Sequence, residues 1–208
     1  DPTFQPEETP SAIRLGRVAC TADPAIARAF DAALGGTGAH ISEVALPGMD
    51  AAFAANIAII GAETWAAFGS LTASPDMGED VRQRLLNASK VTADDLARAE
   101  EVRARFRAEV DAALEGVDAL LLPTMPVFVP TLDEAADAAA MLKLTALVRQ
   151  FNLSGHPALS IPVATPAGLP IGIQLVGRIG GDAALCAVAR ALAPSLDIPT
   201  YLQREEQP

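Results

Sequence analysis

Apolar and polar positions along the chain repeat with two different periods, which predicts both strands and helices. Residues 13–20 suit a strand, and residues 39–46 alternate well enough for a second. Between them, Asp23 and Pro24 are a helix cap and a first-turn proline, so they predict a helix that runs to Leu34 and stops at two glycines. This order of strand, helix and strand favours a βαβ unit with a parallel strand pair.

The middle of the chain has the spacing of helices. Residues 50–68 are apolar and rich in alanine, which predicts a helix buried on several sides. Two more helices are expected at residues 77–89 and 92–114, and the second of these has Thr92 as its cap and two aspartates in its first turn. Its charged residues at helical spacing predict an exposed face with i,i+4 ion pairs: Arg98, Glu101, Arg105 and Glu109.

The last third of the chain returns to strands. Residues 117–122 are all apolar apart from Asp118, as in strands buried within parallel sheets. A single helix is expected over residues 133–151, then strands at 158–163 and 169–176 separated by a turn, and a final helix over 182–192. Together the elements predict one α/β unit.

The chain divides into a short lead and one structured region. Residues 1–10 hold three prolines and a pair of glutamates without periodicity, so we expect a linker or the tail of an upstream region. Residues 11–208 hold all the expected elements.

The composition of the chain limits the classes of partner that it can bind. The chain of 208 residues is 50% hydrophobic but only 4% aromatic, so small and aliphatic side chains must build its core. A formal net charge of −11 with only 15 Lys and Arg argues against a nucleic-acid partner and against an anionic membrane surface. We also expect no membrane span, because no run of about 18 uninterrupted apolar residues occurs.

The two cysteines and the first residues bear on the cellular compartment. Cys20 and Cys186 lie far apart in apolar stretches, which favours two free thiols in the core over a disulfide. The first ten residues have no secretory signal pattern. We therefore expect the cytoplasm.

Two proline-containing segments are candidate binding positions. Residues 123–126 follow a buried strand, where α/β sheets gather ligands, and they would expose the apolar side chains of Met125 and Phe128. Residues 152–157 form an Asn-x-x-Gly-x-Pro turn, in which Gly155 permits a positive φ. From the residues alone, an ordinary turn is the favoured interpretation of each segment. His156 has no acidic or cysteine partner nearby in the sequence, so a turn or pocket-lining role is favoured over general-base catalysis.

The residue types needed for catalysis are not found together. The only lysines, Lys90 and Lys143, have no serine at a spacing that would support a lysine–serine mechanism. The sequence also shows no nucleophile elbow, phosphate loop, metal-ligand spacing or dinucleotide turn. We therefore assign no catalytic residue, metal or cofactor to this chain.

Three motifs in a fixed order resemble a known family. Pro-Thr-Met-Pro at residues 123–126, Asn-Leu-Ser-Gly-His-Pro at 152–157 and Gly-Leu-Pro-Ile-Gly-Ile-Gln at 168–174 resemble the C-terminal part of the amidase-signature hydrolases. These enzymes cleave amides with a Ser–Ser–Lys catalytic set. The resemblance covers residues 11–192 and is most specific over residues 120–177.

The resemblance implies that the two halves of the enzyme have different roles. In such enzymes the N-terminal half carries the lysine, both serines and the oxyanion loop, and the C-terminal half completes the mixed sheet and lines the substrate pocket. Residues 11–208 would then be the C-terminal part of an amidase-signature domain, inactive alone. By the same resemblance, the α/β unit would have a mixed β-sheet flanked by helices. By resemblance, one wall of the pocket would be formed by Met125, Pro126 and Phe128. A second wall would be formed by Asn152, Gly155 and His156.

Three hypotheses follow. The chain is part of an amidase whose N-terminal half, on the same or a separate chain, is its partner and whose substrate is a small amide. Alternatively, it resembles part of the A subunit of a tRNA-dependent amidotransferase, or is a non-catalytic binding or assembly module. Against the module, half a sheet leaves an apolar edge, and the helix at residues 51–68 would be exposed without its partner half. A homodimer is a further arrangement to test.

Overall fold

The computed structural model describes residues 5, 7–166 and 168–199. Five strands form one sheet in the order β2-β1-β3-β5-β4. The first three strands along the chain run parallel, and β5 runs antiparallel to both β3 and β4, so the predicted mixed sheet is confirmed. The strands are β1 Arg14–Val18, β2 His40–Val44, β3 Ala119–Pro123, β4 Ala158–Val163 and β5 Ile171–Val176.

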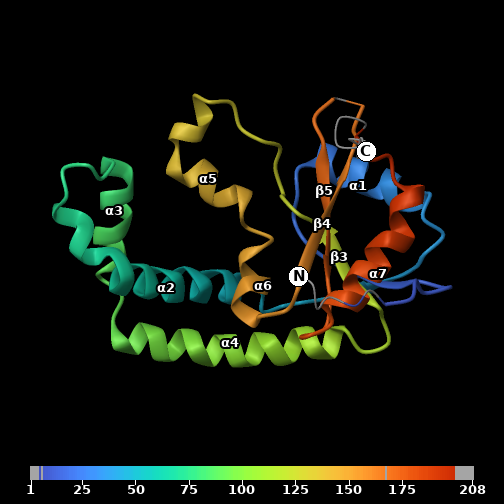
Figure 1. Ribbon diagram of the computed structural model, residues 1–208, viewed down its shortest axis with the longest axis horizontal. Coiled ribbons are helices and arrows are strands. Elements are labelled where there is room, and N and C mark those ends of the chain that lie inside the picture. Colours follow the sequence, from blue (N-terminus) through green and yellow to red (C-terminus); the bar gives the residue numbers. More distant parts are fainter. Residues whose placement is uncertain (1–4, 6, 167, 200–208) are drawn as a thin grey trace.

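Helices cover both faces of the sheet. One face packs against α1 and α7, and the other against α2, α4 and α6. Figure 1 shows α2 and α4 side by side, reaching away from the sheet towards α3, with α5 above α2. The helices are α1 Pro24–Gly35, α2 Met49–Phe68, α3 Glu79–Ala88, α4 Ala93–Ala113, α5 Ala138–Leu144, α6 Arg149–Ser154 and α7 Asp182–Leu192, with 3-10 turns η1 Gly69–Ala73, η2 Glu134–Ala136 and η3 Ala193–Ser195.

Strand β3 belongs to two hydrophobic cores at once. Its residues alternate between the faces of the sheet, as the period of a strand requires. Ala119 and Leu121 join the core beneath α1 and α7, whereas Leu120 and Leu122 join the core beneath α2, α4 and α6. All four are fully buried, which explains why this stretch is almost uniformly apolar.

The predicted helix starts are confirmed by their caps. The Asp23 carboxylate accepts a hydrogen bond of 2.7 Å from the Ala25 backbone amide. At the start of α4, Thr92 and Asp95 form a reciprocal capping box. Hydrogen bonds from the Thr92 hydroxyl and backbone amide, followed by that from Arg98, lower the pKa of Asp95 to about 2.

The single helix expected over residues 133–151 is wrong. The segment breaks into η2, α5 and α6. Asp137 adopts an extended backbone after η2, and the Leu147 carbonyl accepts a hydrogen bond of 2.9 Å from the Gln174 side chain on β5. This carbonyl thus bonds to the sheet within the interruption between α5 and α6.

Helix α2 is less buried than its sequence predicts. Only four of its 20 residues are buried: Ala52, Ala55, Asn56 and Ile59. The expectation of burial on several sides is therefore wrong for the described chain.

The segment Met49–Ala73 is also long and apolar enough to cross a membrane by length and composition, with 22% of its most apolar window buried, although core helices of soluble proteins pass the same test. The requirement of an uninterrupted apolar run was thus too strict a criterion for recognising a candidate membrane span in the sequence.

Two smaller expectations also need correction. Cys20 and Cys186 are free thiols, but Cys20 is exposed and Cys186 is half-buried, so they are not both core residues.

On α4 the expected i,i+4 pair of Arg105 with Glu101 is present at 3.8 Å. The shorter pair of Arg98, 2.6 Å from Asp95, has i,i+3 spacing instead. Glu109 accepts a hydrogen bond from the Gly48 backbone amide, 61 positions away, so it connects α4 to the start of α2.

Candidate functional site

The segment after β3 meets the β4–β5 hairpin through backbone and side-chain contacts. The Thr124 backbone amide donates to the Gly172 carbonyl over 2.8 Å, and the hydroxyls of Thr124 and Ser160 lie 2.6 Å apart. Two motifs about 50 positions apart, at residues 123–126 and 168–174, therefore lie side by side. This end of the hairpin presents a small polar surface, since Ser160 is exposed and Thr124 is half-buried.

Gly172 is required by this contact. A Cβ atom at position 172 would lie 2.4 Å from the Thr124 Oγ1 atom and 2.6 Å from the Ser160 Oγ atom. Both distances are far below van der Waals contact, so any larger residue would separate the two hydroxyls. The glycine of the Gly-Leu-Pro-x-Gly-x-Gln motif thus has a packing reason for its place.

The first expected pocket wall is anchored to the sheet. The Pro126 carbonyl accepts a hydrogen bond of 2.7 Å from the Asp23 backbone amide at the start of α1. Pro126 is buried, whereas Met125 and Phe128 are half-buried and Phe128 packs against the core beneath α1 and α7. The structure thus fixes this segment firmly, and its role as a pocket wall stays a prediction.

The second expected wall begins where α6 ends. Gly155 caps α6 in the left-handed conformation with φ of 77°, and its amide donates to the Phe151 carbonyl over 2.9 Å. The positive φ predicted for this glycine is confirmed. Asn152 is exposed on α6, and its role in binding stays a prediction.

His156 is buried inside a chain of hydrogen bonds. Its Nδ1 atom lies 2.9 Å from the Ser154 Oγ atom, and its Nε2 atom lies 3.1 Å from the Asp111 Oδ1 atom on α4. A carboxylate only accepts, so we assign the ring proton to Nε2. Burial lowers the pKa of His156, and the hydrogen bond and charge of Asp111 partly oppose this effect.

The expectation that His156 lacks an acidic partner is therefore wrong. The partner, Asp111, lies 45 positions earlier in the chain, out of reach of local pattern analysis. The order Ser, His, Asp resembles a catalytic triad, but Ser154 is only 1% exposed and its hydroxyl also lies within bonding distance of the Phe151 carbonyl. A nucleophile must reach its substrate, so this arrangement holds the turn in place instead.

The two expected walls lie towards opposite ends of the hairpin. Pro123 pairs with Ile173, which in turn pairs with Ile161 at one level of the sheet. Ala158 pairs with Val176 at another level, three residues or about 10 Å away along the strand. Met125 follows the first level and His156 precedes the second. Any pocket that uses both walls must therefore extend along the hairpin.

Comparison with known proteins decides the family. A sequence model of the family described as Amidase matches residues 8–186, which is most of the chain. The chain belongs to the amidase-signature family.

Curated members of the family are much longer than the region they share with this chain. The A subunit of glutamyl-tRNA(Gln) amidotransferase from Synechococcus sp. (strain CC9902) is 35% identical over 147 residues, which cover 66% of this chain and 29% of that protein. The corresponding protein from Thermotoga maritima is 32% identical over 127 residues, covering 58% and 26%. The chain thus matches less than a third of these relatives' lengths.

Solved structures agree on the fold. A crystal structure titled as that of an amidase superposes with a TM-score of 0.81 at 27% identity, covering 92% of this chain and 47% of that chain. The A subunit of the Thermotoga maritima amidotransferase gives a TM-score of 0.71 at 27% identity, covering 88% and 42%. The amidase-family fold of the described chain therefore accounts for less than half of each solved chain.

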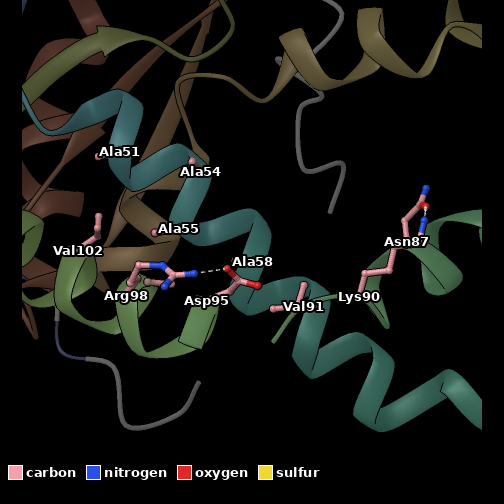
Figure 2. Close-up of a pocket in the computed structure, with 11 residues that line it drawn as sticks. Ala51, Ala54, Ala55, Ala58, Asn87, Lys90, Val91, Asp95, Arg98 and Val102 are labelled. Carbon is pink, nitrogen blue, oxygen red and sulfur yellow. Dashed lines mark hydrogen bonds and ion pairs between the residues drawn. The ribbon is translucent and has the colours of Figure 1, made fainter. Parts of the chain in front are cut away.

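Two hollows flank α2 in this amidase-family chain. The larger, of about 1000 Å³, is a groove with α2 as its floor and with α3, η1 and α5 contributing walls. The smaller, of about 480 Å³, lies between α2 and α4 over four alanines (Figure 2). On the rim of the smaller hollow Arg98 pairs with Asp95, and Lys90 donates to the Asn87 side chain. Its charged groups thus already have partners, an ion pair for Arg98 and Asp95 and a neutral amide for Lys90.

Several residues that support these segments carried no functional signal in the sequence. Arg107 donates to the Ser154 carbonyl over 3.0 Å, and Asp111, one turn further along α4, bonds His156. Ser160 was expected only as part of a strand. Within the described residues, no group of three or more His, Cys, Asp or Glu could hold a metal ion. The i,i+4 spacing of Arg107 and Asp111 was the one available signal, and an exposed ion pair explains it equally well.

Proposed function

We propose that this chain is the C-terminal, pocket-forming part of an amidase that hydrolyses the carbon–nitrogen bond of a small amide. The nucleophile and its activating groups would come from the N-terminal half of the same amidase, on the same or a separate chain. Alone, the chain is expected to be inactive. The proposal places the protein in the cytoplasm, with no nucleic-acid or membrane partner and with a homodimer as an arrangement to test.

The meeting of the sequence motifs supports the proposal most directly. Thr124, Ser160 and Gly172 come from three separate segments and form one small polar surface at the end of the β4–β5 hairpin. Because Ser160 is exposed and Thr124 is half-buried, these hydroxyl groups are placed to meet a polar substrate or a second polypeptide. The family match and the half-length coverage of solved amidases add to this.

The proposed chemistry is acyl transfer in two steps. A serine hydroxyl of the other half attacks the amide carbonyl carbon and loses its proton to an adjacent base. The base passes that proton to the amide nitrogen as the carbon–nitrogen bond breaks, which releases the amine. Water then attacks the resulting ester and releases the carboxylic acid. Residues of this chain, with Met125, Pro126, Phe128, Asn152, Gly155 and His156 as candidates, would shape and orient the amide during both steps.

Reconstitution tests the proposal. The chain would be co-expressed with the segment of the same genome that matches the remaining half of the amidase fold, and a panel of small aliphatic and aromatic amides would be assayed for amine release. We expect hydrolysis by the pair and none by either part alone. A fluorophosphonate probe, which labels activated serines, should mark the added segment and not this chain. Labelling of a serine in residues 1–208 would overturn the assignment of the nucleophile.

The amidotransferase alternative rests on the names of the relatives. Proteins 31–37% identical to this chain are named as A subunits of glutamyl-tRNA(Gln) amidotransferase. The same reconstituted pair, assayed for glutamine-dependent amidation of glutamyl-tRNA(Gln) with its further subunits, separates the two functions. The net charge of −11 is mildly unfavourable for a tRNA partner unless another polypeptide supplies basic surface. A pair inactive in both assays would leave the binding or assembly module.

A further inference from the structure

The groove above α2 exposes an unusual amount of apolar surface. Six side chains that line it are each 38–52% exposed. They come from four elements around the groove: Ile57, Ile60 and Phe68 of α2, Leu71 of η1, Val81 of α3 and Leu142 of α5. Contiguous apolar surface of this kind marks an interaction site more often than a free surface.

Helix α2 has two apolar faces, and only one of them is covered. Ala52, Ala55 and Ile59 recur at helical spacing on the covered face and belong to the core that includes α4 residues. Ile57, Ile60 and Phe68 recur on the face that lines the groove. A helix that is apolar on more than one side is normally buried on more than one side. The second face of α2 is therefore only partly covered within the described chain, by the groove walls at its sides.

The charge of the groove differs from that of the whole chain. Although the chain carries a net charge of −11, the charged side chains among the described groove-lining residues are two arginines, Arg84 and Arg149. Arg84 pairs with Asp80 on its own helix. Arg149 bonds the Thr145 hydroxyl through Nε and lies over the Phe53 ring, without an ion pair among the described residues. An occupant with an apolar face and a carboxylate near Arg149 would complement this lining.

We propose that the groove is the seat of the companion half of the amidase domain, which inserts an apolar segment bearing an acidic side chain opposite Arg149. The inference rests on the proposed function and specifies where the two halves meet. More than half of each solved relative lies outside the region matched by this chain, so ample polypeptide is available to cover α2. A polypeptide also satisfies both requirements at once, because one segment can carry apolar and acidic side chains at helical spacing.

The test measures association of the two halves rather than catalysis alone. The 208-residue chain and the companion segment from the same genome would be titrated by isothermal calorimetry. Ile60→Lys and Phe68→Lys should each weaken binding about tenfold or more, because each places a charge in an apolar contact. Arg149→Gln should weaken it less and should reduce the dependence of binding on salt. Circular dichroism and thermal unfolding would confirm that these exposed substitutions leave the fold intact.

Helix α3 supplies a matched control. Leu86 is 39% exposed, close to the 40% of Ile60, but does not line the groove. Leu86→Lys should therefore leave binding within about twofold of the unsubstituted chain. Hydrogen exchange on the complex should show protection of α2 and α3 amides when the companion is added.

The outcomes separate the two proposals. If the halves associate and hydrolyse amides but the groove variants bind as well as Leu86→Lys, the groove assignment is overturned and the proposed function stands. If the halves neither associate nor hydrolyse amides, both fail. Concentration-dependent dimers of the chain alone that Ile60→Lys abolishes, or flotation with phosphatidylcholine vesicles, would also overturn the companion as occupant in favour of a second copy or a lipid surface.

Discussion

The Nε2 atom of His156 lies 3.1 Å from the Oδ1 atom of Asp111, although 45 positions separate the two residues. This contact joins the turn after α6 to the far end of α4. Arg107, one helical turn before Asp111, bonds the Ser154 carbonyl of the same turn. The Asn-x-x-Gly-x-Pro motif before β4 is thus held by a helix that shows no local sign of the role.

We expect the stability of the chain to fall between pH 7.5 and pH 5 because of His156. Burial lowers the pKa of His156 in the folded state below its ordinary value of 6.5. Below about pH 6.5 the unfolded chain binds more protons at this residue than the folded chain does. The contribution is therefore full above the unfolded pKa and is progressively lost as the pH falls towards the folded pKa. Urea unfolding at several pH values measures it.

His156→Gln should flatten this pH dependence and should cost about 1–3 kcal/mol at pH 7.5, since it disrupts a buried hydrogen-bond chain. The chain has one other histidine, His40, which is exposed on β2 and serves as the matched control. His40→Gln should leave stability at pH 7.5 within about 0.5 kcal/mol of the unsubstituted chain. An unchanged slope in His156→Gln would show that another group causes the pH dependence.

Gly172→Ala should destabilise the chain by about 1–3 kcal/mol, because its Cβ atom would press on the Thr124 and Ser160 hydroxyls. Thermal unfolding by circular dichroism measures the effect. The added change Ser160→Ala should partly restore stability by removing one of the two oxygens. Gly35→Ala is the control, since a Cβ atom there meets nothing within 4 Å, and it should not lower the melting temperature. Equal losses in the two variants would contradict the steric explanation.

Gly155→Ala should cost more than Gly116→Ala. Both glycines have nearly the same positive φ, 77° and 78°, so both alanine variants incur about 1–2 kcal/mol of backbone strain. Only at position 155 would the new Cβ atom also meet an Arg107 Nη2 atom, at 3.1 Å, whereas nothing lies within 4 Å at position 116. The difference between the two free energies of unfolding in urea therefore isolates the Arg107 contact. Equal costs would show that Arg107 moves aside freely.

Thr92→Ala should lower stability by about 1 kcal/mol by removing the cap of α4. It should also raise the pKa of Asp95, which the capping box holds at about 2. The contribution of Asp95 is present above its unfolded value and is lost as the pH falls through about 2. Carboxylate titration by NMR measures the shift. Thr64→Ala, which removes a mid-helix hydroxyl on α2 bonded to the Ile60 carbonyl, is the control and should leave Asp95 unchanged.

Local sequence pattern was enough to locate most elements of this fold. The bounds predicted for β4, residues 158–163, agree with the structure, and Asp23 and Thr92 cap α1 and α4 as expected. These features depend on side-chain period and on groups within three or four positions. The parallel strand pair was also predicted, because a helix between two strands constrains their direction. The mixed sheet was expected from the resemblance to the amidase-signature family.

Other features depend on contacts that no local pattern contains. The break before α6 is accompanied by the bond from Gln174 to Leu147, 27 positions apart, and the environment of His156 depends on Asp111. The exposure of Phe68 likewise depends on which surfaces surround α2 rather than on its own sequence. For the candidate site, sequence supplied the turn residues, and the structure supplied Arg107, Asp111 and Ser160 as their supports.

The position of strand β3 between the two cores has a consequence for how the chain unfolds. Since Leu121 faces one core and Leu120 and Leu122 face the other, neither face of the sheet can come apart without disturbing the strand that both share. We therefore expect a single cooperative transition on unfolding, reported alike by probes on α1 and on α4. A substitution that destabilises the packing on one face of the sheet should therefore also destabilise the packing on the other face.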